Sequence, residues 1–234
     1  MAEYVNIIND YTTVIDDTFY NLALVRKERH YFTPNEPGLT YYSRGFDIDT
    51  TGIENPLVAY SSVCATAYYG MSPNSVTLSV TALNQQGIPN AVANLNDPTK
   101  YLDVYIFGKP KDNTPNVGMK IWDEQGKLVF DANHKYMRPY RTYIENVNYT
   151  PSNSNMRNVS LTFDSNKTYA VFPLGRMFYG SVVTPDVNIY SSVCAVVGNT
   201  AYISSGIVGY EADDFGFGWG VCKHRYFFID VTGY

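Results

Sequence analysis

The first residues to consider are those that could support nucleophilic catalysis. A serine, threonine or cysteine nucleophile needs a base, most often histidine, and the 234-residue chain has three histidines, His30, His134 and His224. None accompanies a Gly-x-Ser-x-Gly sequence or a recognisable cysteine-protease signature. We therefore expect no catalytic triad. A glycosidase would need only two facing carboxylates, which any chain with 22 acidic residues might supply, so the sequence does not test that class.

Two groups of side chains could be drawn together as metal ligands. Structural zinc uses two closely spaced ligand pairs, whereas Cys222-Lys223-His224 is a single Cys-x-His on an expected strand. A buried cysteine and a half-exposed histidine explain it better, even with Cys194 nearby. The run Glu211-Ala212-Asp213-Asp214 lacks the spacing of a calcium loop and reads as an exposed acidic turn. We expect no metal and no cofactor.

The segment Phe215-Gly216-Phe217-Gly218-Trp219-Gly220 alternates bulky rings with glycines. It is unsuited to cradling a phosphate, which needs close backbone approach and a following helix. Its rings either fill a core or form an aromatic platform for a sugar or a partner side chain. Adjacent strand residues point to opposite faces, so one tyrosine of each pair 41–42 and 68–69 should face outward. The candidate binding residues are Phe215, Phe217, Trp219, Tyr42 and Tyr69.

Composition limits the remaining functions. The net charge is −5 and no run of lysine or arginine occurs, which argues against nucleic-acid binding. No apolar stretch approaches the roughly 18 residues of a membrane span, and the first residues lack a signal-peptide pattern, so we expect no membrane insertion. Three cysteines are too few for a disulfide scaffold and suit reduced thiols packed as small hydrophobic groups.

Short strands separated by turns must position these residues. Charged residues make up only 17% of the chain, whereas 22 tyrosines favour strands. Hairpins are expected over residues 7–15, 57–82, 119–130 and 187–203. Along 76–81, apolar residues alternate with hydroxyl residues, as in a strand that is wet on one side. This pattern predicts an all-β protein of the β-sandwich type, Ig-like or Greek-key.

The chain also repeats itself. Residues 60–65 and 190–195 share the identical sequence Tyr-Ser-Ser-Val-Cys-Ala, and weaker matches link 5–22 with 119–137 and 101–108 with 226–233. We therefore expect two tandem sandwiches related by duplication, 1–108 and 117–234, joined by a polar, proline-containing linker, 109–116. Cys64 and Cys194 would then occupy equivalent buried positions. In an alternative arrangement the two halves interleave in one pseudo-symmetric sandwich.

Residues 117–131 carry a resemblance to a known class of protein. Their pattern runs from Gly118 through Met119-Lys120-Ile121 to Gly126 and then Leu128-Val129-Phe130-Asp131. It resembles the start of small β-rich virion proteins of tailed bacteriophages, and residues 4–16 show a degenerate form of it. The resemblance implies a non-enzymatic virion component near the tail tip or fibres. Other virion proteins, further copies of the chain or a host-surface glycan or receptor would be its partners.

Three other functions stay open from the sequence. A free carbohydrate-binding module or a capsid decoration protein would also suit a β-rich chain without a catalytic signature, and a glycan hydrolase comes after them. The virion hypothesis places the protein in the particle, assembled in the host cytoplasm.

Overall fold

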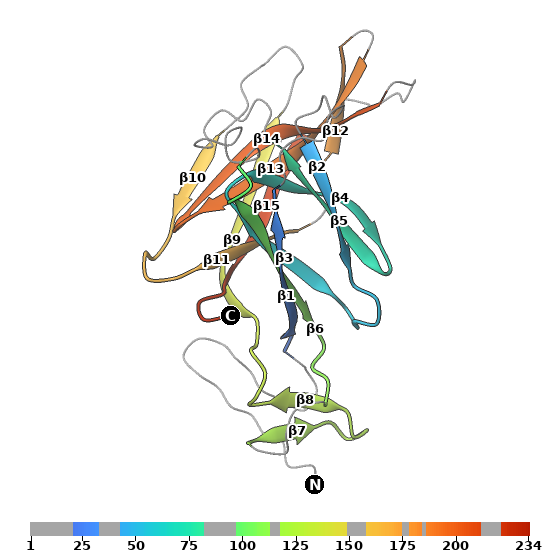
Figure 1. Ribbon diagram of the computed structural model, residues 1–234, viewed down its shortest axis with the longest axis vertical. Coiled ribbons are helices and arrows are strands. Elements are labelled where there is room, and N and C mark those ends of the chain that lie inside the picture. The colour runs from blue at the N-terminus through green and yellow to red at the C-terminus, as the bar shows by residue number, and fades with distance from the viewer. Residues whose placement is uncertain are drawn as a thin grey trace.

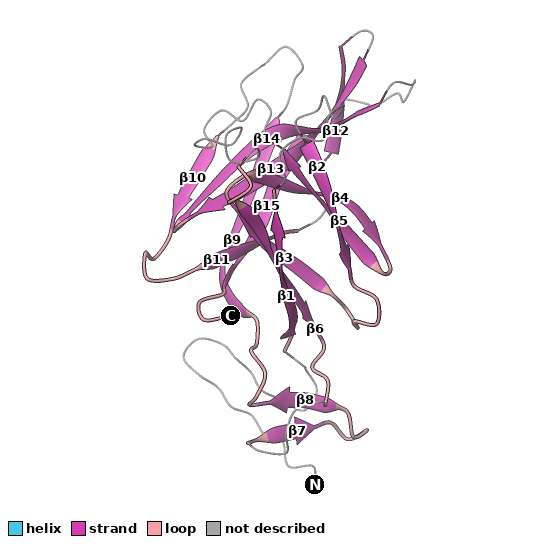
Figure 2. Cartoon of the chain, viewed as in Figure 1, coloured by secondary structure: helices cyan, strands magenta, loops and turns pink. Residues whose placement is uncertain are grey.

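The computed structural model describes residues 21–32, 43–81, 97–112, 118–148, 158–174, 178–183, 186–211 and 221–234. These residues form strands and no helix, which confirms the expected all-β class (Figure 2). In chain order the strands are β1 (Ala23–Tyr31), β2 (Ser43–Asp49), β3 (Leu57–Ser62), β4 (Ala65–Ser72), β5 (Ser75–Thr81), β6 (Tyr101–Gly108), β7 (Lys120–Trp122), β8 (Leu128–Asp131), β9 (Arg138–Asn148), β10 (Val159–Thr162), β11 (Tyr169–Pro173), β12 (Phe178–Val183), β13 (Asp186–Val197), β14 (Thr200–Glu211) and β15 (Val221–Asp230).

Two large sheets build the sandwich (Figure 1). The six-stranded sheet has the order β1-β6-β3-β11-β15-β9, and the seven-stranded sheet has the order β10-β14-β13-β4-β5-β2 with β12 beside β13. The main core lies between them: Tyr60, Val104 and Phe228 contribute from the first sheet, and Leu78 and Ile203 from the second. Packing one sheet against the other buries these apolar side chains away from water, and this burial holds the two layers together.

The two expected tandem sandwiches are not confirmed. Each large sheet contains strands from both halves of the chain. At the centre of one sheet β3 pairs with β11 through Tyr60 and Val171, and at the centre of the other β4 pairs with β13 through Thr66 and Cys194. Either half alone would leave these central strands as open edges. Each large sheet therefore interleaves strands from the two halves, as in the alternative arrangement.

The two halves nevertheless place their strands in the same order. Outward from the centre, β3, β6 and β1 correspond to β11, β15 and β9 in one sheet; β4, β5 and β2 correspond to β13, β14 and β10 in the other. The identical hexapeptides do not correspond, because residues 60–65 run from β3 through a bend into β4 whereas residues 190–195 lie within β13. The expected equivalence of Cys64 and Cys194 is therefore wrong, although both thiols are buried.

Several expected hairpins are present. β7 pairs with β8, and β13 pairs with β14 through a turn at Gly198, whose φ of 60° suits glycine. The hairpin expected over 57–82 is only partly right: β4 and β5 form it, whereas a bend at residues 63–64 places β3 in the other sheet. Val76, Leu78 and Val80 all face the core, as the alternation along β5 predicts. The hairpin expected over residues 7–15 lies outside the described residues.

Candidate functional site

The residues named from the sequence as a binding platform are mostly outside the described part of the chain. Phe215, Phe217 and Trp219 belong to residues 212–220, and Tyr42 belongs to 33–42, so none of the four is placed. Tyr69 lies in β4, at a register irregularity between Tyr68 and Gly70, but its side chain is not described. The structure therefore brings no two of these candidates together, and the platform stays a prediction.

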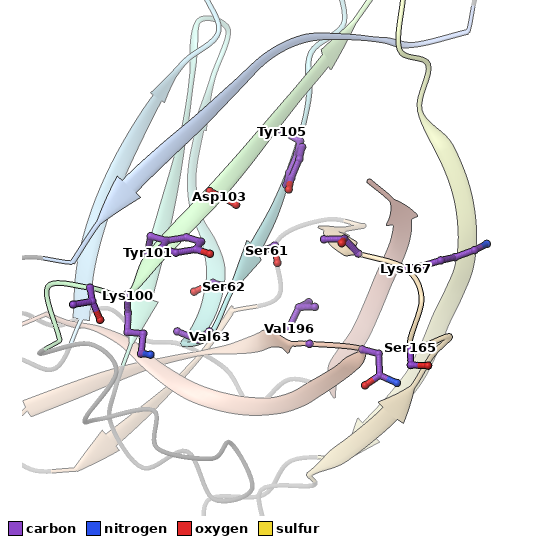
Figure 3. Close-up of a pocket in the computed structure, with 14 residues that line it drawn as sticks. Ser61, Ser62, Val63, Lys100, Tyr101, Asp103, Tyr105, Ser165, Lys167 and Val196 are labelled. Carbon is purple, nitrogen blue, oxygen red and sulfur yellow. The ribbon is translucent and has the colours of Figure 1, made fainter. Parts of the chain in front are cut away.

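A pocket of about 500 Å³ lies at the start of β6, beside the end of β3 (Figure 3). The turn that joins β10 to β11 and the turn between β13 and β14 complete its wall. Its lining is rich in hydroxyl groups. The lining residues are Ser61, Ser62, Val63, Thr99, Lys100, Tyr101, Asp103, Tyr105, Ser165, Lys167, Thr168, Val196, Gly198 and Asn199.

Strand geometry explains why these side chains meet. Tyr101, Asp103 and Tyr105 alternate along β6, so they share the face of the sheet that points away from the main core. In the neighbouring strands Arg29 of β1 and Ser61 of β3 both lie opposite Asp103. A row of Arg29, Asp103 and Ser61 therefore crosses three strands, with a tyrosine on either side of it along β6.

An ion pair holds the carboxylate of this row in place. Arg29 donates from Nε to Oδ1 of Asp103 at 2.7 Å and from Nη2 to Oδ2 at 2.8 Å, and Lys27 Nζ lies 4.0 Å from Oδ2. The hydrogen bond to Asp103 raises the pKa of the Arg29 guanidinium above its already high ordinary value. Asp103 is only 7% exposed, and the two hydrogen bonds from Arg29 fix the orientation of its carboxylate.

The two tyrosines are held as well. The Arg29 guanidinium lies 3.6 Å from the centre of the Tyr101 ring, and Tyr31 packs edge-on against the same ring. Lys27 Nζ lies 5.0 Å from the centre of the Tyr105 ring. Burial, followed by the charge of Asp103, raises the pKa of Tyr105, so its hydroxyl stays protonated at neutral pH. Both rings are therefore held in place by neighbouring cations.

Asp103 is the only carboxylate among the pocket's described lining residues, whereas glycoside hydrolysis needs two facing carboxylates. Across the described residues no group of three or more histidine, cysteine or acidic side chains could hold a metal ion. Those residues also contain no helix long and apolar enough to span a membrane.

The sequence contains a signal for this pocket that was not recognised. Lys27-x-Arg29-x-Tyr31 and Tyr101-x-Asp103-x-Tyr105 both have the two-residue period of a strand face, with complementary charges at their centres. Only the pairing of β1 with β6, which joins segments 74 residues apart at Arg29 and Asp103, shows that the two patterns meet.

A second feature lies in the β7–β8 hairpin, which forms a separate two-stranded sheet beyond one end of the sandwich (Figure 1). Gly126 ends its turn with a φ of 76°, and Asp123 Oδ1 accepts hydrogen bonds from the backbone N–H groups of Gln125 and Lys127 at 2.9 and 2.7 Å. Gly118, before β7, has a φ of 103°. Both glycines thus occupy backbone conformations that other residues rarely adopt.

The same hairpin has a buried acid at its end. Asp131 is fully buried and accepts hydrogen bonds from Asn133 N and Nδ2, both at 2.8 Å, while Lys120 Nζ lies 3.7 Å away. Leu128 and Val129 are also buried. Gly118, Gly126, Leu128, Val129 and Asp131 of the 118–131 pattern therefore have structural roles in this hairpin.

Comparison of the chain with protein-family models, with curated proteins and with solved structures gives no match. The function is therefore argued from the pocket and the hairpin.

The two described thiols are expected to react slowly with a thiol reagent in the native protein. Burial raises the pKa of Cys64 to about 12 and also raises the pKa of Cys194, so little reactive thiolate forms at neutral pH. In a Cys222→Ala background, labelling by DTNB should become fast only in denaturant. Serine at either position should destabilise the fold more than alanine, because a buried hydroxyl needs a partner. Rapid labelling of both thiols in the native state would contradict this expectation.

Proposed function

We propose that this chain is a non-enzymatic structural component of a tailed-phage virion, associated with the tail tip or fibres. In this role it assembles with other virion proteins, with further copies of itself, or with both, and it contacts the host surface. The observation that carries the proposal is the β7–β8 hairpin, which bears the residues of the virion-protein resemblance.

The hairpin has the properties of an attachment element. A two-stranded hairpin is only marginally stable alone, and this one stands outside the two large sheets. It nevertheless leaves Met119 and Trp122 each 46% exposed. Large exposed apolar side chains on a projecting element are typical of protein contacts, and tryptophan is enriched among the residues that dominate binding. We assign this surface to a neighbouring virion protein.

Particle composition tests the proposal directly. Particles of the phage that encodes the chain should contain it after purification through a density gradient, at a constant ratio to the major capsid protein when measured by mass spectrometry. A chain that is expressed during infection but absent from purified particles would overturn the proposal.

Replacing Trp122 with alanine should weaken incorporation into particles. If the ring fills a pocket on the neighbouring protein, the loss should be about 1–3 kcal/mol of binding free energy, with the melting temperature nearly unchanged. The matched control is Met71→Ala, which also removes a large exposed apolar side chain, 53% exposed, from the β4–β5 hairpin. Equal incorporation of Trp122→Ala and the unchanged protein would exclude this ring from the contact.

The pocket favours a second candidate, a carbohydrate-binding module. Its hydroxyl lining and its single fixed carboxylate are features that a sugar site uses, and they do not depend on a virion.

A further inference from the structure

We propose that the pocket beside Tyr101, Asp103 and Tyr105 binds a neutral saccharide unit, such as the terminal residue of a surface glycan. This inference deepens the host-contact part of the proposed function, and it is argued from the pocket alone.

The size and position of the pocket suit a small polar ligand. Its volume of about 500 Å³ falls within the range of about 300–1,000 Å³ that small-molecule sites occupy. Figure 3 shows Tyr101, Asp103 and Tyr105 along one strand, with Ser61 and Ser62 on the strand beside it. Polar groups from two strands thus surround one space, as they must to contact several hydroxyl groups of one ring.

The hydrogen-bonding groups of the pocket match those of a sugar. Among the described residues, the side-chain hydroxyl groups of Ser61, Tyr101 and Tyr105 have no hydrogen-bond partner. Tyr105 is only 2% exposed, so its hydroxyl reaches little solvent other than the pocket. A hydroxyl group can both donate and accept, and so can each hydroxyl group of a saccharide. A ligand rich in hydroxyl groups therefore suits these groups of the pocket.

The carboxylate adds acceptors in a fixed orientation. Each oxygen of Asp103 receives one hydrogen bond from Arg29 and retains a further lone pair. Adjacent sugar hydroxyl groups can donate to such oxygens. Because Arg29 fixes the carboxylate before the ligand arrives, little conformational entropy remains to be lost on binding.

Charge argues for a neutral rather than an anionic ligand. Lys100 and Lys167 also line the pocket, but each lies near a carboxylate outside it: Lys100 Nζ is 3.9 Å from Asp97 and Lys167 Nζ is 3.4 Å from Asp230. Asp103 would meanwhile repel an anion. Both lysines that line the pocket therefore already have a carboxylate partner, which makes the pocket unsuited to an anionic ligand.

The rings supply the apolar contact that sugars use. Tyr101 is 36% exposed, and its ring contacts the Arg29 guanidinium and the Tyr31 ring. A rigid aromatic ring gives contact area at low entropic cost, and the C–H face of a pyranose is the surface that such a ring contacts.

Titration of the purified full-length chain tests the inference without any phage particle. Glucose, galactose, mannose and N-acetylglucosamine are added separately at millimolar concentrations, and binding is followed by NMR chemical shifts or calorimetry. At least one should bind saturably with an affinity that is nearly independent of salt. Glucuronate and N-acetylneuraminate, the anionic probes, should bind more weakly. Preferential, salt-sensitive binding of the anionic probes, or no saturable binding by any neutral sugar, would overturn the proposal.

Two variants locate the binding. Tyr105→Phe removes one oxygen and keeps the ring, and it should weaken the sugar's affinity by about tenfold, because the sugar loses a hydrogen bond in a site with little solvent. Ser61→Ala should also weaken the affinity for the sugar. Tyr202→Phe is the matched control: this residue of β14 packs against a separate apolar cluster on β4 and β13, and the loss of its hydroxyl should leave sugar binding unchanged. Binding that all three variants leave unchanged would place the sugar elsewhere and overturn the assignment.

The two proposals fail separately. A chain that binds sugar but is absent from particles refutes the virion role, and a chain present in particles that binds no neutral sugar refutes the pocket assignment.

Discussion

Residues 1–112 and 114–234, produced as separate chains, are expected to remain largely unfolded. The reason is that the main core takes residues from both halves, and that the central pairs β3–β11 and β4–β13 both join one half to the other. Each isolated half would expose two unpaired strand edges and much of its apolar surface. Far-ultraviolet circular dichroism and thermal melting should show a cooperative transition for the intact chain and for neither fragment.

Mixing provides the control for this experiment. The two fragments should regain the cooperative transition when refolded together, because the same strand pairs can form between chains. Cooperative melting of each fragment alone would contradict the expectation and would instead support two independently folding units with the boundaries 1–108 and 117–234.

Replacing Tyr60 with alanine should destabilise the protein by about 3–5 kcal/mol, which corresponds to a fall of about 6–20 °C in melting temperature. Tyr60 is fully buried and lies in the main core, where β3 meets β11. Burial raises the pKa of Tyr60 well above its ordinary value, so its hydroxyl keeps its proton. That hydroxyl donates to the carbonyl oxygen of Thr66 at 2.6 Å, joining β3 to the start of β4.

Tyr60→Phe separates the two contributions. It keeps the ring but leaves the buried carbonyl of Thr66 without this donor, so the expected loss is about 1–3 kcal/mol. Met71→Ala, an exposed substitution, should change the free energy of unfolding by less than about 0.5 kcal/mol. Denaturant unfolding measures all three. A Tyr60→Ala variant as stable as Met71→Ala would show that this position is not part of the core.

Local sequence patterns predicted the strands better than their partners. The turn chemistry of Asp123 and Gly126 and the position of Gly198 correctly indicated hairpins, because turns are decided by neighbouring residues. Alternation along β5 correctly indicated which face is buried. It cannot indicate which strand lies alongside, because any strand with an apolar face fits the same core.

The repeated hexapeptide shows how this limit leads to error. Identical residues suggested identical positions, yet Cys64 lies in a bend between the two sheets while Cys194 lies within β13. The small serine, cysteine and alanine side chains of this hexapeptide suit a buried bend as well as a buried strand. Tertiary context, and not local propensity, decided between them.

The pocket escaped prediction for a related reason. Aromatic-rich segments such as Phe215–Gly220 are conspicuous in the sequence, whereas the pocket depends on ordinary residues that only the sheet brings together. Arg29, Ser61 and Asp103 lie in three separate strands, and their meeting follows from the order β1-β6-β3. Without that order, Asp103 is one acidic residue among 22.

The central pairing of β3 with β11 and of β4 with β13 also bears on how such a molecule can be built. A half-length chain with six of these strands could cover its open edges only by associating with a second copy, so its folded fraction would fall on dilution. Joining the two halves covalently makes that association intramolecular and replaces the bulk concentration with a fixed effective concentration. The stability of the 234-residue chain should therefore be independent of dilution, unlike that of a half-length chain that must pair with a second copy.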